Sequence, residues 1–140
     1  MQNASDATIR DILLDTRVIA LVGFSANPAR PSHSVAHFLV ANGYRVIPVN
    51  PGLEGQIFQG EPIRANLADC PPEVEMVDIF RRSEAVDALV SSAIAYLPDL
   101  KTIWMQIGVQ DMQSAKRADA HGLRVVWNKC PKIEHGRLLG

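Results

Sequence analysis

The chain of 140 residues has the length of one ordinary domain, and 47% of its residues are hydrophobic, which suffices for a core without disulfides or metals. Its 14 Lys and Arg against 15 Asp and Glu give a formal net charge of −1. No overall electrostatic field therefore attracts nucleic acid or an anionic membrane. We expect a single domain over residues 1–140, in which any bound anion is held by a local site.

The cysteines and the N-terminal sequence indicate a cytoplasmic protein. Cys70 and Cys130 lie far apart in the sequence and form neither a CxxC pair nor a disulfide framework, which favours a reducing compartment. Residues 1–15 lack the basic and apolar regions of a signal peptide, and no segment approaches the roughly 20 apolar residues of a membrane span. We therefore expect neither a membrane nor a nucleic acid as a partner.

Helical and strand patterns alternate along the chain. Within residues 1–16, the spacing of Ile9, Ile12 and Leu13 predicts a short N-terminal helix that packs on the sheet. Short apolar runs rich in Val and Ile follow, and these are typical of parallel strands buried on both faces. The predicted strands are 18–22, 46–49, 74–80, 102–107 and 123–127, and the helical patterns between them are 35–41, 83–95 and 112–120.

Glycines and prolines mark the ends of these elements. Gly43 and Gly122 stand directly before predicted strands, where helix-ending glycines belong. Residues 51–73 contain several glycines and prolines and predict an irregular insertion with a small strand near Ile63. The fold class we predict is α/β: a Rossmann-like open parallel sheet of about five strands with helices on both faces.

The turn after the first strand, residues 23–34, is a candidate anion site. In such a sheet, ligands bind beyond the carboxyl ends of the strands, and a helix beginning near Ser32 directs unpaired N–H groups there. The GxGxxG fingerprint is incomplete, because Gly23 has no second or third glycine after it. The hydroxyls of Ser25 and Ser32 and the guanidinium of Arg30 would replace those glycines. Alternatively, Ser32 only caps the helix and Arg30 is solvated.

Polar residues also follow the later strands. Asn50 stands after the second strand, in place of the carboxylate that holds an NAD ribose, and a ribose bearing a phosphate tolerates this change better. The third strand ends in Phe80 and Arg81–Arg82, which would bring a ring and cations to the crevice or would form a solvated pair beside a capped helix. The fourth strand ends in Gln106 and Gly108.

Several segments together resemble the small CoA-binding domain family, in the same order and at the same spacing. They are VGFSANPARPSHSV, GYRVIPVNP, VDIFRRSE, IWMQIGV and VVWNKCPKIEH, between Ile19 and Glu134. Members of that family are stand-alone relatives of the CoA-binding domain of succinyl-CoA synthetase α subunits. The resemblance implies that coenzyme A is the ligand and that its binding residues are Gly23, Ser25, Asn27, Pro28, Arg30, Ser32, Asn50, Pro51, Phe80, Arg81, Gln106 and Gly108.

The expected function is a non-catalytic binding module for coenzyme A or an acyl-CoA. A synthetase α subunit continues into a second domain that carries a phosphorylated histidine, and this sequence stops at Gly140, so ligase activity is not expected. Two alternatives remain open at this point. One is an NAD(P)-dependent oxidoreductase with the same fold, and the other is an interaction protein with a vestigial nucleotide pocket.

Few residues suggest chemistry. His33 and His37 are one helical turn apart, but no third metal ligand is near them in the sequence. Cys130 follows the fifth strand, where it would either form a mixed disulfide with the thiol of coenzyme A or be a small packed residue, with His135 as a candidate base. We expect Asp78 to be a hydrogen-bonding residue at a strand end, without a catalytic role.

Overall fold

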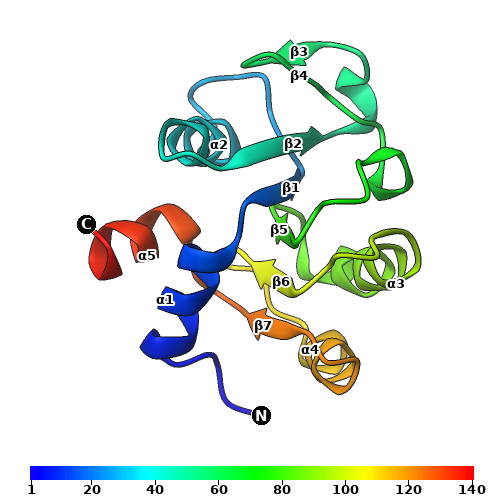
Figure 1. Cartoon of the computed structure of the whole chain (residues 1–140). Coiled ribbons are helices and arrows are strands. Elements are labelled where there is room, and N and C mark those ends of the chain that lie inside the picture. Colours follow the sequence, from blue (N-terminus) through cyan, green and yellow to red (C-terminus); the bar gives the residue numbers. More distant parts are fainter.

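The computed structural model describes all residues, 1–140, and contains a five-stranded parallel sheet (Figure 1). Its strand order is β2-β1-β5-β6-β7. The strands are β1 (Val18–Val22), β2 (Arg45–Val49), β5 (Met76–Ile79), β6 (Thr102–Met105) and β7 (Arg124–Val126). The direction of strand succession reverses between β1 and β5, and this is the place where doubly wound sheets bind ligands.

Helices cover both faces of the sheet, so the predicted α/β, Rossmann-like fold class is confirmed (Figure 1). None of the helices combines the length and the apolar character that crossing a bilayer requires. One face carries α1 (Asp6–Asp15), α2 (Pro31–Ala41) and α5 (Pro131–Leu138), and the other carries α3 (Val86–Tyr96) and α4 (Met112–Ala120).

The strands are apolar without alternation because each of their faces is covered. In β1, Ile19 and Leu21 pack with the residues of α1 and α2, whereas Ala20 and Val22 pack with those of α3 and α4. The observed strands are shorter than several of the predicted runs. Val74, for example, is fully buried but precedes β5. Burial extends into the loops beyond the hydrogen-bonded part of a strand, so an apolar run can be longer than the strand itself.

The segment between β2 and β5 is irregular, as its glycines and prolines predict. Near Ile63 it contains only a short hairpin with two residues in each strand. Arg64, which follows Ile63, forms an isolated bridge with Val49 of β2. Its elements are the 3-10 turn η1 (Pro51–Leu53), the strands β3 (Ile57–Phe58) and β4 (Glu61–Pro62), and the 3-10 turn η2 (Leu67–Asp69). A further 3-10 turn, η3 (Ser83–Ala85), leads into α3.

Helix α5 was not predicted from the sequence. It begins with Pro131, contains Gly136, a poor helix former, and lacks an apolar stripe at helical spacing. Its position is determined by contacts that are distant in the sequence.

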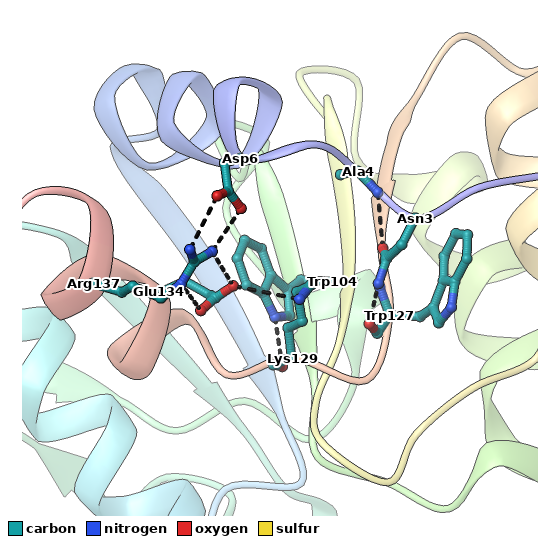
Figure 2. Close-up of polar contacts among 8 residues, drawn as sticks. All are labelled: Asn3, Ala4, Asp6, Trp104, Trp127, Lys129, Glu134 and Arg137. Carbon is teal, nitrogen blue, oxygen red and sulfur yellow. Dashed lines mark hydrogen bonds and ion pairs between the residues drawn. The ribbon is translucent and has the colours of Figure 1, made fainter.

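Figure 2 shows these contacts. The guanidinium of Arg137 donates to both carboxylate oxygens of Asp6 in α1, at 2.7 and 3.0 Å, and to both oxygens of Glu134, each at 3.1 Å. The indole N–H of Trp104 in β6 donates to the carbonyl oxygen of Lys129 at 2.9 Å, directly before α5. The C-terminal helix is therefore tied to both α1 and the sheet.

Gly23 directly follows β1 and lies against the backbone that follows β5. Its φ is +89°, and a Cβ atom at this position would lie 2.2 Å from the carbonyl oxygen of Phe80, on the neighbouring strand end. Backbone atoms cannot move aside as a flexible side chain can. Only glycine therefore fits both the conformation and the space.

We predict that Gly23→Ala lowers the free energy of unfolding by about 2–5 kcal/mol, because left-handed strain and a backbone clash add together. Gly122→Ala is the matched control, because Gly122 has φ +87° and no atom within 4 Å of the added Cβ position. That variant should lose only about 1–2 kcal/mol. Denaturant unfolding of both variants checks this, and equal losses would contradict the clash.

Asp78 is the most deeply buried ionisable residue of the sheet. It lies in β5 between Leu21 and Trp104 of the adjacent strands, is 0% exposed, and has no hydrogen-bond partner for either carboxylate oxygen. The expectation that it bonds at a strand end is wrong, because the residue is enclosed within the sheet. Burial raises the pKa of the Asp78 carboxyl well above its ordinary value of 3.8.

The raised pKa makes Asp78 a source of pH-dependent stability. The folded protein holds this proton more tightly than the unfolded chain, so the stabilisation is fully present at low pH and is lost as pH rises through the folded pKa. Above pH 3.8, we expect the free energy of unfolding of Asp78→Asn to rise relative to that of the wild type. The rise should be at most about 1.4 kcal/mol per pH unit and should stop once the wild-type carboxyl has ionised.

Asp15→Asn is the control with the opposite sign. Hydrogen bonds of 2.8 and 2.9 Å from Arg124 lower the pKa of the Asp15 carboxyl, so the advantage of the wild type over this variant should shrink as pH falls. Denaturant melts between acidic and neutral pH measure both trends. A constant difference between Asp78→Asn and the wild type would contradict the raised pKa.

Candidate functional site

Three hollows lie along the carboxyl edge of the sheet. The first, the turn hollow, has a volume of about 580 Å³ and lies over the turn from β1 to α2. Its walls come from this turn, from the residues after β2 and from the end of β5. The lining residues are Gly23, Phe24, Ser25, Ala26, Asn27, Arg30, Pro31, Ser32, Asn50, Leu53 and Phe80.

Side chains of the turn hold its backbone in shape. The Ser32 hydroxyl accepts from the N–H of Ser25 at 3.1 Å, and the Ser25 hydroxyl accepts from the N–H of Asn27 at 3.1 Å. The Asn27 side chain in turn accepts from the N–H of Ala29 at 3.0 Å. Each serine therefore uses an oxygen lone pair within the turn and keeps its O–H free to donate.

Other donors at the turn are also free. The N–H groups of Ala26 and Ser32 have no acceptor in the protein, and α2 begins without a side-chain cap after Arg30. The guanidinium of Arg30 forms no ion pair and lines the hollow. Hydroxyls, backbone N–H groups and a guanidinium with no protein acceptor form a suitable site for an oxyanion such as phosphate.

The second hollow, the central hollow, has a volume of about 440 Å³ and lies between the ends of β1, β2 and β5. Asn50 forms part of its wall, but its amide already donates to the Phe24 carbonyl at 2.7 Å and accepts from the Gly52 N–H at 2.9 Å. Asn50 therefore joins the β1 turn to η1. The hollow is lined by Val22, Gly23, Val49, Asn50, Pro51, Ala65, Asn66, Leu67, Phe80, Arg81, Leu89 and Ser92.

The third hollow, the C-terminal hollow, has a volume of about 730 Å³ and lies over the ends of β5 and β6. Two exposed isoleucines, Ile107 and Ile133, give it an apolar rim. Gln106 is only 6% exposed, and its side-chain oxygen has no hydrogen-bond partner. The lining residues are Pro31, Val35, Phe80, Arg81, Arg82, Gln106, Ile107, Gly108, Val109, Cys130 and Ile133.

Phe80, the residue after β5, lines all three hollows. Gly23 and Asn50 are shared by the turn and central hollows, and Arg81 is shared by the central and C-terminal hollows. The three hollows therefore adjoin one another across the carboxyl ends of β1, β2, β5 and β6, and together we call them the edge groove.

The edge groove collects most of the residues that the sequence pointed to. Pro28 is the exception, since it lies against a separate hollow that Ser34, Phe38 and Lys132 also line. The turn formed by the Asn27 side chain reverses the chain around Pro28 and directs it to this side. The predicted residues that line the groove are Gly23, Ser25, Asn27, Arg30, Ser32, Asn50, Pro51, Phe80, Arg81, Gln106 and Gly108.

Several residues of the groove had no signal in the sequence. Asn66 and Leu67 come from the irregular segment, and Leu89 and Ser92 come from one side of α3. A strand end can be recognised by its apolar run, whereas nothing local shows which side of a helix borders a groove.

Arginines in the edge groove differ from most of the others in their pairing. Arg30, Arg81 and Arg82 line the groove and have no carboxylate partner. The arginines that pair with carboxylates are not among the lining residues and are Arg45, Arg64, Arg117, Arg124 and Arg137. In a chain of net charge −1, the groove is thus a local concentration of uncompensated positive charge.

The histidines lie outside the groove lining. His33 packs against the rings of Phe24 and Phe58, with centroids 5.5 and 5.2 Å away, and its Nδ1 lies 3.0 Å from the Ser25 carbonyl oxygen. His135 packs edge-on against aromatic rings. No group of three His, Cys, Asp or Glu side chains comes together as metal ligands.

Known proteins of the same size match the chain over nearly its whole length. An uncharacterized protein of Bacillus subtilis, YneT, is 31% identical over 135 residues, which cover 96% of this chain and 97% of YneT. The solved structure of a hypothetical protein from Pyrococcus horikoshii is 35% identical, with a TM-score of 0.90, and the match covers 100% of this chain and 98% of that one.

A structure from Thermus thermophilus is 32% identical, with a TM-score of 0.89, and covers 96% of this chain and 99% of its own. The family model described as a CoA binding domain matches residues 17–136, which include every strand of the sheet and every residue of the edge groove. The chain therefore belongs to the CoA-binding domain family.

Proposed function

We propose that this protein binds coenzyme A, free or acylated, in the edge groove, and that it acts as a non-catalytic binding module. The observation that carries the proposal is the arrangement of the three hollows. The turn hollow, with its anion donors, shares Gly23 and Asn50 with the central hollow and Pro31 with the C-terminal hollow. Coenzyme A has a matching order of parts, because its diphosphate lies between the adenosine and the pantetheine arm.

The phosphates would bind in the turn hollow. The hydroxyls of Ser25 and Ser32 and the free N–H of Ser32 are donors there, and Arg30 supplies a charge-assisted contact. Arg81 reaches the same region, since its Cδ lies 3.2 Å from the position of a Cβ on Gly23. This set provides by side chains what a backbone of three glycines provides in dinucleotide enzymes.

The adenosine would lie in the central hollow. Leu67 and Leu89 offer apolar walls to a planar ring, and Asn50 with Pro51 forms the side next to β2. Because the backbone uses both ends of the Asn50 amide, we assign that residue to shaping the hollow and not to reading the ribose. The lack of a carboxylate at this position disfavours NAD.

The pantetheine arm would occupy the C-terminal hollow. Ile107 and Ile133 suit its aliphatic parts, and the unpartnered oxygen of Gln106 suits one of its amide N–H groups. We place this function in the cytoplasm, because both cysteines of the protein are free thiols, which suits a reducing compartment.

Coenzyme A should raise the melting temperature of the purified protein, since a ligand that binds only the folded state stabilises it. Dephospho-CoA should raise it less, because it lacks the 3′-phosphate, and NAD⁺ should have no effect. Thermal shift measurements at matched concentrations check this order. Stabilisation by NAD⁺ alone would instead favour the oxidoreductase, and no shift with any nucleotide would favour an interaction protein.

Arg30→Ala should weaken coenzyme A binding by about 1.5–3 kcal/mol, or roughly tenfold to hundredfold in Kd, because it removes a charged hydrogen bond. Arg17→Ala is the matched control. Arg17 also has no ion pair and is exposed, but it precedes β1 and therefore lies at the opposite edge of the sheet. Isothermal titration calorimetry measures both variants, and equal losses of affinity would exclude a specific role for Arg30.

A further inference from the structure

Cys130 is a free thiol that borders the edge groove. It stands immediately before α5 and lines the C-terminal hollow, and the residue as a whole is only 7% exposed. A group enclosed in this way is reached mainly through the hollow. A molecule that fills the hollow therefore lies against this residue.

The position of Cys130 is well determined by its neighbours. The carbonyl of Lys129 accepts from the Trp104 indole at 2.9 Å, and Arg137 links Asp6 to Glu134 on the other side (Figure 2). The side chain of Lys129 also pairs with Glu134, at 3.6 Å. The thiol is thus presented by a segment anchored to β6, α1 and α5.

A second observation points to a ligand in the same hollow. The side-chain oxygen of Gln106 is buried without a hydrogen-bond partner, although its residue lines the hollow together with Cys130. An unpaired buried acceptor is costly, so such a group indicates a missing donor. The amide N–H groups of a pantetheine arm are donors of this kind, and they precede the terminal thiol of coenzyme A.

The charges around the hollow suit a reacting thiolate. Arg81 and Arg82 line it and have no carboxylate partner. The nearby carboxylate of Glu134 is compensated by Arg137 and Lys129. Reactive cysteines are typically found in such electropositive surroundings that a ligand can enter.

Cys70, the other cysteine, has a different environment. It lies after η2 and does not line the edge groove. Burial raises the pKa of the Cys70 thiol to about 12, which keeps it protonated and unreactive at neutral pH. The protein therefore contains an internal control for any reaction assigned to Cys130.

We infer that Cys130 is a thiol–disulfide exchange site for coenzyme A, and that the protein captures the disulfide form of this ligand as a mixed disulfide. The inference rests on the proposed function. In the step, Cys130 gives its proton to solvent, and its thiolate attacks one sulfur of a CoA disulfide. The S–S bond of that disulfide breaks, a bond forms between Cys130 Sγ and the attacked sulfur, and the other CoA leaves as a thiolate that takes up a proton.

Electrons balance in this exchange without a further oxidant. Cys130 is oxidised from a thiol to a disulfide, while the departing CoA is reduced from a disulfide to a thiol. A second thiol reverses the reaction by the same route. The protein would thus hold coenzyme A covalently under oxidising conditions and release it when thiols are restored.

The test is intact-mass spectrometry of the wild-type protein after incubation with CoA disulfide. We expect the mass to rise by one coenzyme A less the hydrogens of the two thiols, with peptide mapping placing the adduct on Cys130 and dithiothreitol removing it. Glutathione disulfide at the same concentration should react at least about tenfold more slowly, because nothing holds it in the groove. Equal rates, or an adduct on Cys70, would overturn the inference.

Two variants complete the experiment. Cys70→Ser should still form the adduct, and Cys130→Ser should form none. Should Cys130→Ser fail to fold, peptide mapping of the wild type and of Cys70→Ser still decides the site. Thermal shift with reduced coenzyme A on the wild type separates the two proposals. Stabilisation without an adduct rejects only the exchange site, whereas neither stabilisation nor adduct rejects the CoA-binding function as well.

Discussion

The close approach of Gly23 to the carbonyl of Phe80 is the constraint on which the edge groove depends. A Cβ atom on Gly23 would lie 2.2 Å from that backbone oxygen. The parallel pairing of β1 with β5 places Phe80 and Arg81 beside the turn from β1, although they are far from it in the sequence. Residues from several strand ends can therefore share one groove, as expected where strand order reverses.

The positive charge of the groove arises because its arginines have no carboxylate partners. Most arginines elsewhere are neutralised by carboxylates, whereas Arg30, Arg81 and Arg82 have none. The turn adds hydroxyl and N–H donors that its own hydrogen bonds leave free. An almost neutral protein can thus bind a highly charged ligand, because affinity for an anion depends on the local field and not on net charge.

The C-terminal segment adds a cysteine to the proposed binding site. Helix α5 has little intrinsic tendency to form, and it is held by Arg137 and by the bond between Trp104 and Lys129. These contacts hold Cys130 at the far end of the groove, beside Gln106. The cysteine that the sequence left open as a packed residue or a reacting thiol thereby lines the hollow in which we propose that the pantetheine arm lies.

The sequence by itself determined the order of strands and helices and the polar residues at the strand ends, because apolar runs and helix-ending glycines are local signals. Only the tertiary structure decided that Pro28 lies outside the groove, that Asn50 is used by the backbone and that Asp78 is enclosed without a partner. It also supplied α5 and the α3 wall at Leu89. The physical reason is that burial, hydrogen-bond pairing and the side of a helix that faces a groove depend on neighbours far away in the chain.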